Sequence, residues 1–108
     1  MKIRIFPCMF VLGLGLTLAG TALAEGDPVA GKAKASTCLG CHGVPGYTNT
    51  YPTYRVPKLG GQHVPYLVNA MQAYQAGHRA HDTMHAQISN LSAQDMADIA
   101  AWFSSHRD

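Results

Sequence analysis

The sequence predicts a small all-α domain of three to five helices, and two observations lead to this prediction. Helix signals occupy three stretches of the chain, near residues 28–37, 65–76 and 92–103. The segments between them are punctuated by proline and glycine, so they read as loops rather than strands. The chain has 108 residues and no internal repeat, which favours one small domain.

The first helix is predicted to begin at Asp27-Pro28, because Asp is a good N-cap and Pro is favoured at the first helical position. The residues from Val29 to Thr37 are rich in Ala and Lys, which are strong helix formers. This helix leads directly into residues 38–42. Gly43 follows them and lets the chain turn away.

Residues 38–42 read Cys-Leu-Gly-Cys-His, which is the C-x-x-C-H attachment signature of c-type haem. Two thiols three residues apart on a helical turn lie on one side of the chain, so each can add to one haem vinyl group as a thioether. The next residue, His42, then meets the iron as its proximal ligand. The sequence therefore predicts one haem c, covalently bound through Cys38 and Cys41.

Two other interpretations of the cysteine pair are weaker. A redox dithiol of the thioredoxin type requires a βαβ context, and none is visible in the sequence. A structural zinc site usually needs four protein ligands, and no second cysteine pair exists, because the third cysteine is the isolated Cys8.

Residues 44–61 are predicted to form a long loop, because three prolines and three glycines interrupt them. A loop of this length is unusual in a small domain, but it is reasonable if the loop wraps a prosthetic group. Tyr47, Tyr51 and Tyr54 recur in it. We expect them to pack over the loop, with some of them covering the haem edge.

A second helix is predicted from about Pro65 to Ala76, with Gly77 ending it. Its apolar residues recur at helical spacing and form one face, namely Tyr66, Leu67, Ala70, Met71 and Tyr74.

Residues 78–91 are predicted to be irregular. The last helix opens at Ser92 with a near capping box to Asp95, and its buried face is marked by Met96, Ile99, Ala100 and Phe103, with Trp102 beside it.

The first 24 residues are predicted to be a cleaved signal peptide. Lys2 and Arg4 form a charged start, an apolar run follows from Phe10 to Leu18, and residues 22–24 read Ala-Leu-Ala, a small-x-small cleavage site. A retained membrane anchor is the weaker alternative, because the apolar run is shorter than the about 20 residues of a spanning helix. We expect cleavage after Ala24, a haem domain at residues 25–108 and a periplasmic protein.

A domain of this size often needs a staple to be stable, and a covalent haem would supply one. The full chain carries a net charge of +2. Because Lys2 and Arg4 belong to the predicted leader, the remaining basic and acidic residues balance. No basic block suggests nucleic acid as a partner.

The ordered motifs of the chain resemble those of bacterial class I cytochromes c. The chain is most similar to one haem domain of the dihaem c-four type cytochromes and their monohaem relatives. The resemblance covers nearly all of residues 25–108 and is carried by Gly26-Asp27, Gly31, Cys38 to Gly43, Pro57 to Gln62, Tyr66-Leu67, Tyr74, Gly77 to Arg79, Met84, Leu91-Ser92, Asp95 and Ile99 to Phe103. The chain departs from the dihaem pattern by having one haem domain, Gly60 where relatives often have Ala, and a histidine-rich ligand loop.

The resemblance implies roles for two further residues. Gly31 would allow the first and last helices to cross closely, with Trp102 against it, which agrees with the close approach that glycine permits. Pro57 would offer its carbonyl to the Nδ1–H group of His42. Such a bond would fix the imidazole and raise its basicity.

The sixth iron ligand has several candidates. Met71 and Met96 fall on apolar helix faces, where a core role is the better explanation. Met84 lies in the predicted loop among polar residues, so we expect it to be the distal ligand. Its rivals are His63, His78, His81 and His85, of which His85 and His81 are the strongest. The predicted site residues are thus Cys38, Cys41, His42, Pro57 and Met84, with His42 and Met84 on the iron.

The predicted function is that of an electron carrier rather than an enzyme, because His/Met ligation leaves the iron without an open position. We expect single-electron exchange with protein partners of a respiratory or related chain, such as a membrane oxidase, a quinol-oxidising complex or a soluble dehydrogenase. The membrane would be contacted only through those partners, and the protein would be a monomer or weak dimer. The alternatives are a haem subunit of a periplasmic dehydrogenase complex, and a haem-based peroxidase or gas sensor with a labile sixth ligand.

Overall fold

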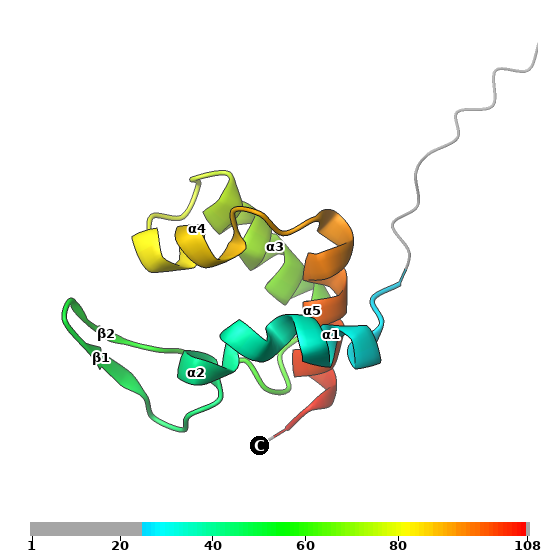
Figure 1. The fold of residues 1–108 in the computed structure, drawn as a ribbon, viewed down its shortest axis with the longest axis horizontal. Helices are drawn as coiled ribbons and strands as arrows, with labels where there is room; N and C mark the ends of the chain where they lie inside the picture. Colours follow the sequence, from blue (N-terminus) through cyan, green and yellow to red (C-terminus); the bar gives the residue numbers. More distant parts are fainter. Residues whose placement is uncertain (1–24, 108) are drawn as a thin grey trace, which may run out of the picture.

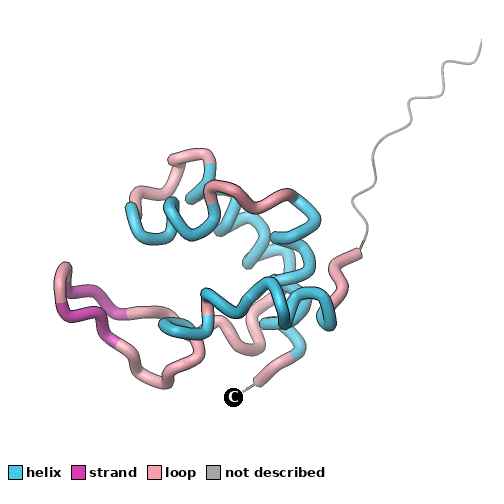
Figure 2. Tube along the Cα trace, in the orientation of Figure 1, coloured by secondary structure: helices cyan, strands magenta, loops and turns pink. Residues whose placement is uncertain are grey.

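The computed structural model describes residues 25–107, so the predicted signal peptide and Asp108 lie outside the described residues. Helices dominate the described chain, as predicted (Figures 1 and 2). In chain order the elements are α1 (Pro28–Lys34), the 3₁₀ turn η1 (Ala35–Thr37), α2 (Leu39–His42), β1 (Thr48–Thr50), β2 (Thr53–Arg55), α3 (Val64–Gln75), α4 (Asp82–Ile88) and α5 (Ala93–Ser105).

Helix α1 begins where the sequence predicts it. The Asp27 carboxylate accepts a hydrogen bond of 2.8 Å from the Val29 N–H, which caps the helix. The helix then crosses α5 (Figure 1), and Gly31 lies at the contact. A Cβ at Gly31 would lie 1.9 Å from the Asp98 carbonyl oxygen and 2.9 Å from the Cβ of Trp102. The contact that the family resemblance implies at Gly31 is therefore present, and only glycine fits there.

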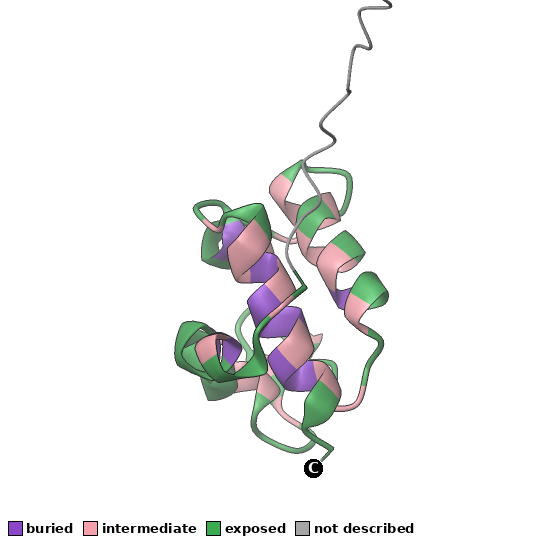
Figure 3. Cartoon of the chain, turned by 90° about the vertical axis from the view of Figure 1, so that its right-hand side faces the viewer, coloured by how far each residue is buried: buried purple, intermediate pink, exposed green. Residues whose placement is uncertain are grey.

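Helix α5 contributes most of the core, and buried positions gather along it in Figure 3. Its N-terminus is a complete capping box: the Ser92 hydroxyl accepts from the Asp95 N–H at 3.1 Å, and the Asp95 carboxylate accepts from the Ser92 N–H at 3.0 Å. The four residues predicted to form its buried face are buried, namely Met96, Ile99, Ala100 and Phe103, and so is Trp102. Ile99, Ala100, Trp102 and Phe103 form one core cluster with Ala35 of η1 and Leu67 of α3.

The segment 44–61 differs from the prediction, because it contains a β-hairpin. Strands β1 and β2 pair antiparallel, with Thr48 opposite Arg55 and Thr50 opposite Thr53. The reading of this segment as loop alone is therefore wrong. Threonine and tyrosine favour strands, but each strand has only three residues, which is too short for a periodicity to be visible among the flanking prolines and glycines.

The segment 78–91 also differs, because helix α4 occupies residues Asp82–Ile88. Met84 consequently lies on a helix and not in an irregular loop. The cause of the wrong prediction is the cap: the Nδ1 atom of His81 accepts from the Met84 N–H at 3.3 Å. Histidine is not one of the residues that signal an N-cap in a sequence.

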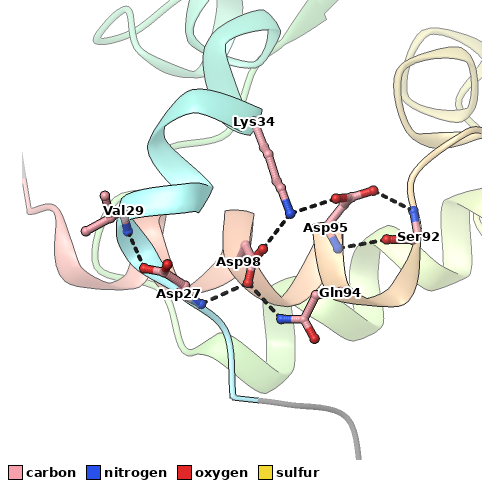
Figure 4. A network of polar contacts seen from close by, with 7 residues as sticks. All are labelled: Asp27, Val29, Lys34, Ser92, Gln94, Asp95 and Asp98. Carbon is pink, nitrogen blue, oxygen red and sulfur yellow. Dashed lines mark hydrogen bonds and ion pairs between the residues drawn. The ribbon is translucent and has the colours of Figure 1, made fainter.

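A polar network joins α1 to the N-terminal half of α5 (Figure 4). The Lys34 ammonium lies 2.6 Å from an Asp98 carboxylate oxygen and 2.8 Å from one of Asp95. The buried Asp98 also accepts from the Asp27 N–H and the Gln94 side chain, each at 2.8 Å. These hydrogen bonds lower the pKa of Asp98 to about 2, and the bond to Lys34 has the largest effect. Hydrogen bonds to Lys34 and to Ser92 likewise lower the pKa of Asp95 to about 2.

This network predicts a loss of stability in acid. Because the pKa of Asp98 is lower in the folded protein than its ordinary value of 3.8, its ionised form stabilises the fold above that value. The contribution disappears as the pH falls from about 4 towards 2. Urea unfolding followed by circular dichroism should show Asp98→Asn less stable than wild type at neutral pH, with the difference shrinking towards pH 2. Glu25→Gln, at an exposed position outside the network, is the control. A difference between Asp98→Asn and wild type that stays constant across this range would contradict the assignment.

Candidate haem site

A cavity of about 440 Å³ opens beside the core and is lined by residues of η1, of every α-helix and of β2. Its floor is apolar and includes Leu67, Ile99, Ala100 and Phe103, which belong to the core cluster. The volume falls in the range of roughly 300–1,000 Å³ that is typical of ligand and cofactor sites. Cys38, Cys41, His42, Pro57 and Met84 all line it, so the structure brings the five predicted site residues together.

One short helical turn presents the attachment motif to this cavity. The N–H groups of Cys41 and His42 both donate to the Cys38 carbonyl, at 3.2 and 2.8 Å. This tight turn brings Cys38, Cys41 and His42 to the lining of the same cavity, where the two thiols could attach a haem and the imidazole could bind its iron.

The two thiols are half-buried and are not joined in a disulfide. Burial raises the pKa of the Cys38 thiol above its ordinary value. A catalytic or redox-active cysteine is usually a thiolate of lowered pKa, so this environment does not favour the dithiol interpretation. Residues 25–107 contain no group of three or more His, Cys, Asp and Glu side chains that could hold a metal ion.

The His42 ring is oriented by the segment that follows the hairpin. Its Nδ1 atom lies 2.8 Å from the Pro57 carbonyl oxygen. Because a carbonyl can only accept, Nδ1 carries the proton and Nε2 keeps its lone pair. The free nitrogen is thus available to an iron, and the hydrogen bond fixes the plane of the ring.

Met84 lines the cavity from α4, while His42 lines it from α2. Of the four rival histidines, only His81 also lines the cavity. Its Nδ1 atom accepts the Met84 N–H at 3.3 Å, so in the neutral ring Nε2 carries the proton and has no lone pair for a metal. His85 has its Nδ1 atom 2.9 Å from the Tyr74 carbonyl, and neither it nor His63 nor His78 lines the cavity.

The other two methionines have different positions. Met96 is 1% exposed in the core, as its place on an apolar helix face predicts. Met71 packs against the core cluster but also lines the cavity. Helical periodicity identifies an inward-facing residue, but it does not say whether that residue faces the core or a cavity.

Two tyrosines, Tyr54 of the hairpin and Tyr74 of α3, pack against His81 in the lining of the cavity. The rings of Tyr54 and Tyr74 lie edge-on to the His81 ring, with centroids 4.7 and 6.2 Å away. The Tyr54 hydroxyl also lies 3.3 Å from the Thr83 hydroxyl, which connects the hairpin to α4. Of the three loop tyrosines, Tyr54 alone lines the cavity, and Tyr51 is 95% exposed.

The charge of the lining also fits a haem. Its charged residues are the basic Lys34, Arg55, Lys58 and Arg79, of which Lys34 is paired with Asp95 and Asp98, and the lining residues include no Asp or Glu. Haem is a large apolar plate that carries two propionate carboxylates, so a mainly apolar wall with basic groups matches it. The thiols, the imidazole, the thioether and the basic rim together form a donor set that suits haem c.

The helical fold and this donor set define a small domain built around one covalently attached haem. A family model described as Cytochrome c matches residues 28–107, so the chain belongs to the cytochrome c family. Proteins of this family carry covalently bound haem c, and Cys38 and Cys41 stand in the C-x-x-C-H position.

Two relatives illustrate the extent of the match. The chain is 45% identical to cytochrome c4 of Pseudomonas aeruginosa over 97 residues, which cover 90% of this chain and 46% of that protein. It is 41% identical to cytochrome c-554(548) of Halomonas halodenitrificans over 83 residues, which cover 74% of this chain and 96% of that protein. The chain therefore spans about half the length of the cytochrome c4 relatives and almost all of the second relative.

The fold has a counterpart among solved structures. The crystal structure of reduced recombinant cytochrome c4 from Pseudomonas stutzeri matches with a TM-score of 0.57 and 22% identity, over 80% of this chain and 53% of that one. This likeness confirms the predicted cytochrome c fold. None of the helices in the described part of the chain has the length and apolar character that a membrane span demands.

Proposed function

We propose that this protein is a monohaem c-type cytochrome that carries single electrons between redox proteins. In this proposal Cys38 and Cys41 would hold the haem covalently, His42 and Met84 would ligate its iron, and the Pro57 carbonyl orients His42. The observation that supports it best is that His42 and Met84 come from separate helices and line the same apolar cavity.

The ligand pair explains why transfer of electrons is favoured over catalysis. The haem, when bound, supplies a one-electron couple at its iron. His42 and Met84 together would hold the iron and leave it no open position, and methionine ligation raises the reduction potential. A peroxidase or gas sensor needs a vacant or labile position instead, and the histidine nearest to Met84 in the cavity wall, His81, is engaged in capping α4.

The proposed location is the periplasm, after cleavage of residues 1–24. Donors and acceptors there would be a membrane oxidase, a quinol-oxidising complex or a soluble dehydrogenase. Transient redox contacts are small, below about 1,200 Å² in total. Because basic and acidic residues balance after Ala24, the exchange rate should depend only mildly on ionic strength.

Stopped-flow mixing of the purified holoprotein with a redox partner tests the proposal, beside assays of peroxide turnover and of carbon monoxide binding. Fast, reversible one-electron exchange with an iron that binds no carbon monoxide is the expected result. Rapid peroxide turnover, or tight carbon monoxide binding by the ferrous wild type, would support the enzyme or sensor alternative. Recovery of the protein only in a stable complex with a dehydrogenase would make it a subunit of that complex.

A further inference from the structure

The end of α3 holds α4 in place. The Nδ1 atom of His85, in the middle of α4, lies 2.9 Å from the carbonyl oxygen of Tyr74, and the side chain of the adjacent residue, Gln75, reaches the C-terminal end of α4. Between these contacts the chain turns through Gly77, which has a φ of +76°. Two consecutive residues of α3 therefore fix the helix that carries Met84.

The Gln75 amide makes an unusual set of contacts. Its Nε2 atom lies 3.1 Å from the carbonyl oxygen of Ile88, 3.2 Å from that of Ser89 and 2.9 Å from that of Leu91. The last carbonyls of a helix lack partners within the helix and must be satisfied from elsewhere. Since carbonyls only accept, the NH₂ group of the amide faces them. From another helix, Gln75 thus binds the C-terminal end of α4 at Ile88 and Ser89 and the following residue Leu91, and it supplements the 3.1 Å bond from the Leu91 N–H to the Ile88 carbonyl.

These Gln75 contacts act on the wall of the haem cavity. Met84 and Ile88 are four residues apart and share one face of α4, and both line the cavity together with Leu91. Fixing the carbonyls of Ile88 and Leu91 therefore limits how far the Met84 face of α4 can move away. At the opposite end of α4, the described side-chain contacts are the His81 cap and the Tyr54–Thr83 contact.

We propose that Gln75 is a positioning residue that holds Met84 at the iron and so keeps external ligands out. The inference rests on the proposed function, because it takes Met84 as the distal ligand. Gln75 would not contact the haem through its amide group. It would act by restricting the opening of the segment 82–91.

Imidazole is a suitable probe, because it competes with Met84 for ferric iron. Its apparent affinity is measured at neutral pH by absorbance titration for wild-type holoprotein and for Gln75→Leu, Gln75→Glu and Gln75→Lys. We expect Gln75→Leu to raise the affinity about tenfold, the scale set by losing one or two hydrogen bonds to the part-buried carbonyls of Ile88 and Leu91. Gln75→Glu should raise it further, because a carboxylate repels three carbonyl oxygens. Gln75→Lys should remain near wild type, because an ammonium offers three donors at a helix C-terminus.

Two control variants separate positioning from general weakening of the fold. Gln72→Leu makes the same change on an exposed position of the same helix and should bind imidazole as wild type does. Asp98→Asn weakens the α1–α5 network, far from the Gln75 contacts in sequence, and should lower stability without raising the imidazole affinity. Equal affinities for wild type, Gln75→Leu and Gln75→Glu would overturn the proposal, as would an equal rise in Asp98→Asn.

The wild-type spectrum keeps this proposal distinct from the proposed function. A wild-type protein without the weak red-edge band of Met–iron ligation would overturn the assignment of Met84 itself. If the wild type shows that band and the Gln75 variants bind imidazole with the wild-type affinity, only the role of Gln75 is overturned. If neither the Leu nor the Glu variant yields holoprotein, the shorter Gln75→Asn is titrated instead, and an unchanged imidazole affinity there would overturn the proposal.

Discussion

Replacing Met84 with alanine should abolish the weak red-edge absorption band of the oxidised protein and open the iron to carbon monoxide and cyanide. Alanine has no atom that can bind the iron. The Nε2 atom of the neighbouring His81 carries a proton and so has no lone pair for the iron. The reduction potential should fall, on the order of a tenth of a volt out of the ~0.8 V range that axial ligands can span. Absorbance spectra of both oxidation states and a potentiometric titration measure these changes.

Met71 and Met96 provide matched controls for this prediction. Met96→Ala should cost about 2–5 kcal/mol of unfolding free energy, as is usual for truncation of a buried methionine, because Met96 is 1% exposed. Met71→Ala should cost less, since Met71 is only half-buried. Both variants should keep the Met–iron band. A Met84→Ala protein with an unchanged spectrum would transfer the role to another residue, and Met71, which also lines the cavity, would then be tested together with His81.

The features that the sequence predicted well are those with local signals. The caps at Asp27 and Ser92 involve side chains bonded two or three residues away, so the residue types alone indicate them. The turn that carries Cys38, Cys41 and His42 is equally local. The contact between His42 and Pro57 spans 15 residues, and the resemblance to a family, not the local pattern, indicated it.

The features that were missed depend on contacts with no local signal. Helix α4 begins at a histidine cap, and the hairpin strands have three residues each, so neither element has a recognisable pattern. Gln75 bonds carbonyls that lie 13, 14 and 16 residues further along the chain. Backbone carbonyls exist at every residue, so no side-chain type marks them as its partners. A glutamine near a helix end therefore looks like an ordinary surface residue until the chain is folded.

Removal of the attachment thiols should have the broadest effect on the protein. Cys38→Ala and Cys41→Ala each leave at most one thioether bond, so we expect little mature holoprotein from either, and His42→Ala should lose the proximal ligand. The double cysteine variant should release its haem to acidified organic solvent, whereas wild type should retain it. Cys8→Ser, in the predicted leader, should behave as wild type.

The fold should fail together with the haem, because the cavity wall is part of the core. Leu67, Ile99, Ala100 and Phe103 belong to the core cluster and also line the cavity, so without the haem their inner faces would be exposed to water. A domain of this size has little other apolar surface to bury. We therefore expect the double variant to lose its cooperative thermal transition in circular dichroism. A variant that binds no haem and still unfolds cooperatively near the wild-type temperature would show that the helices form a complete core without it.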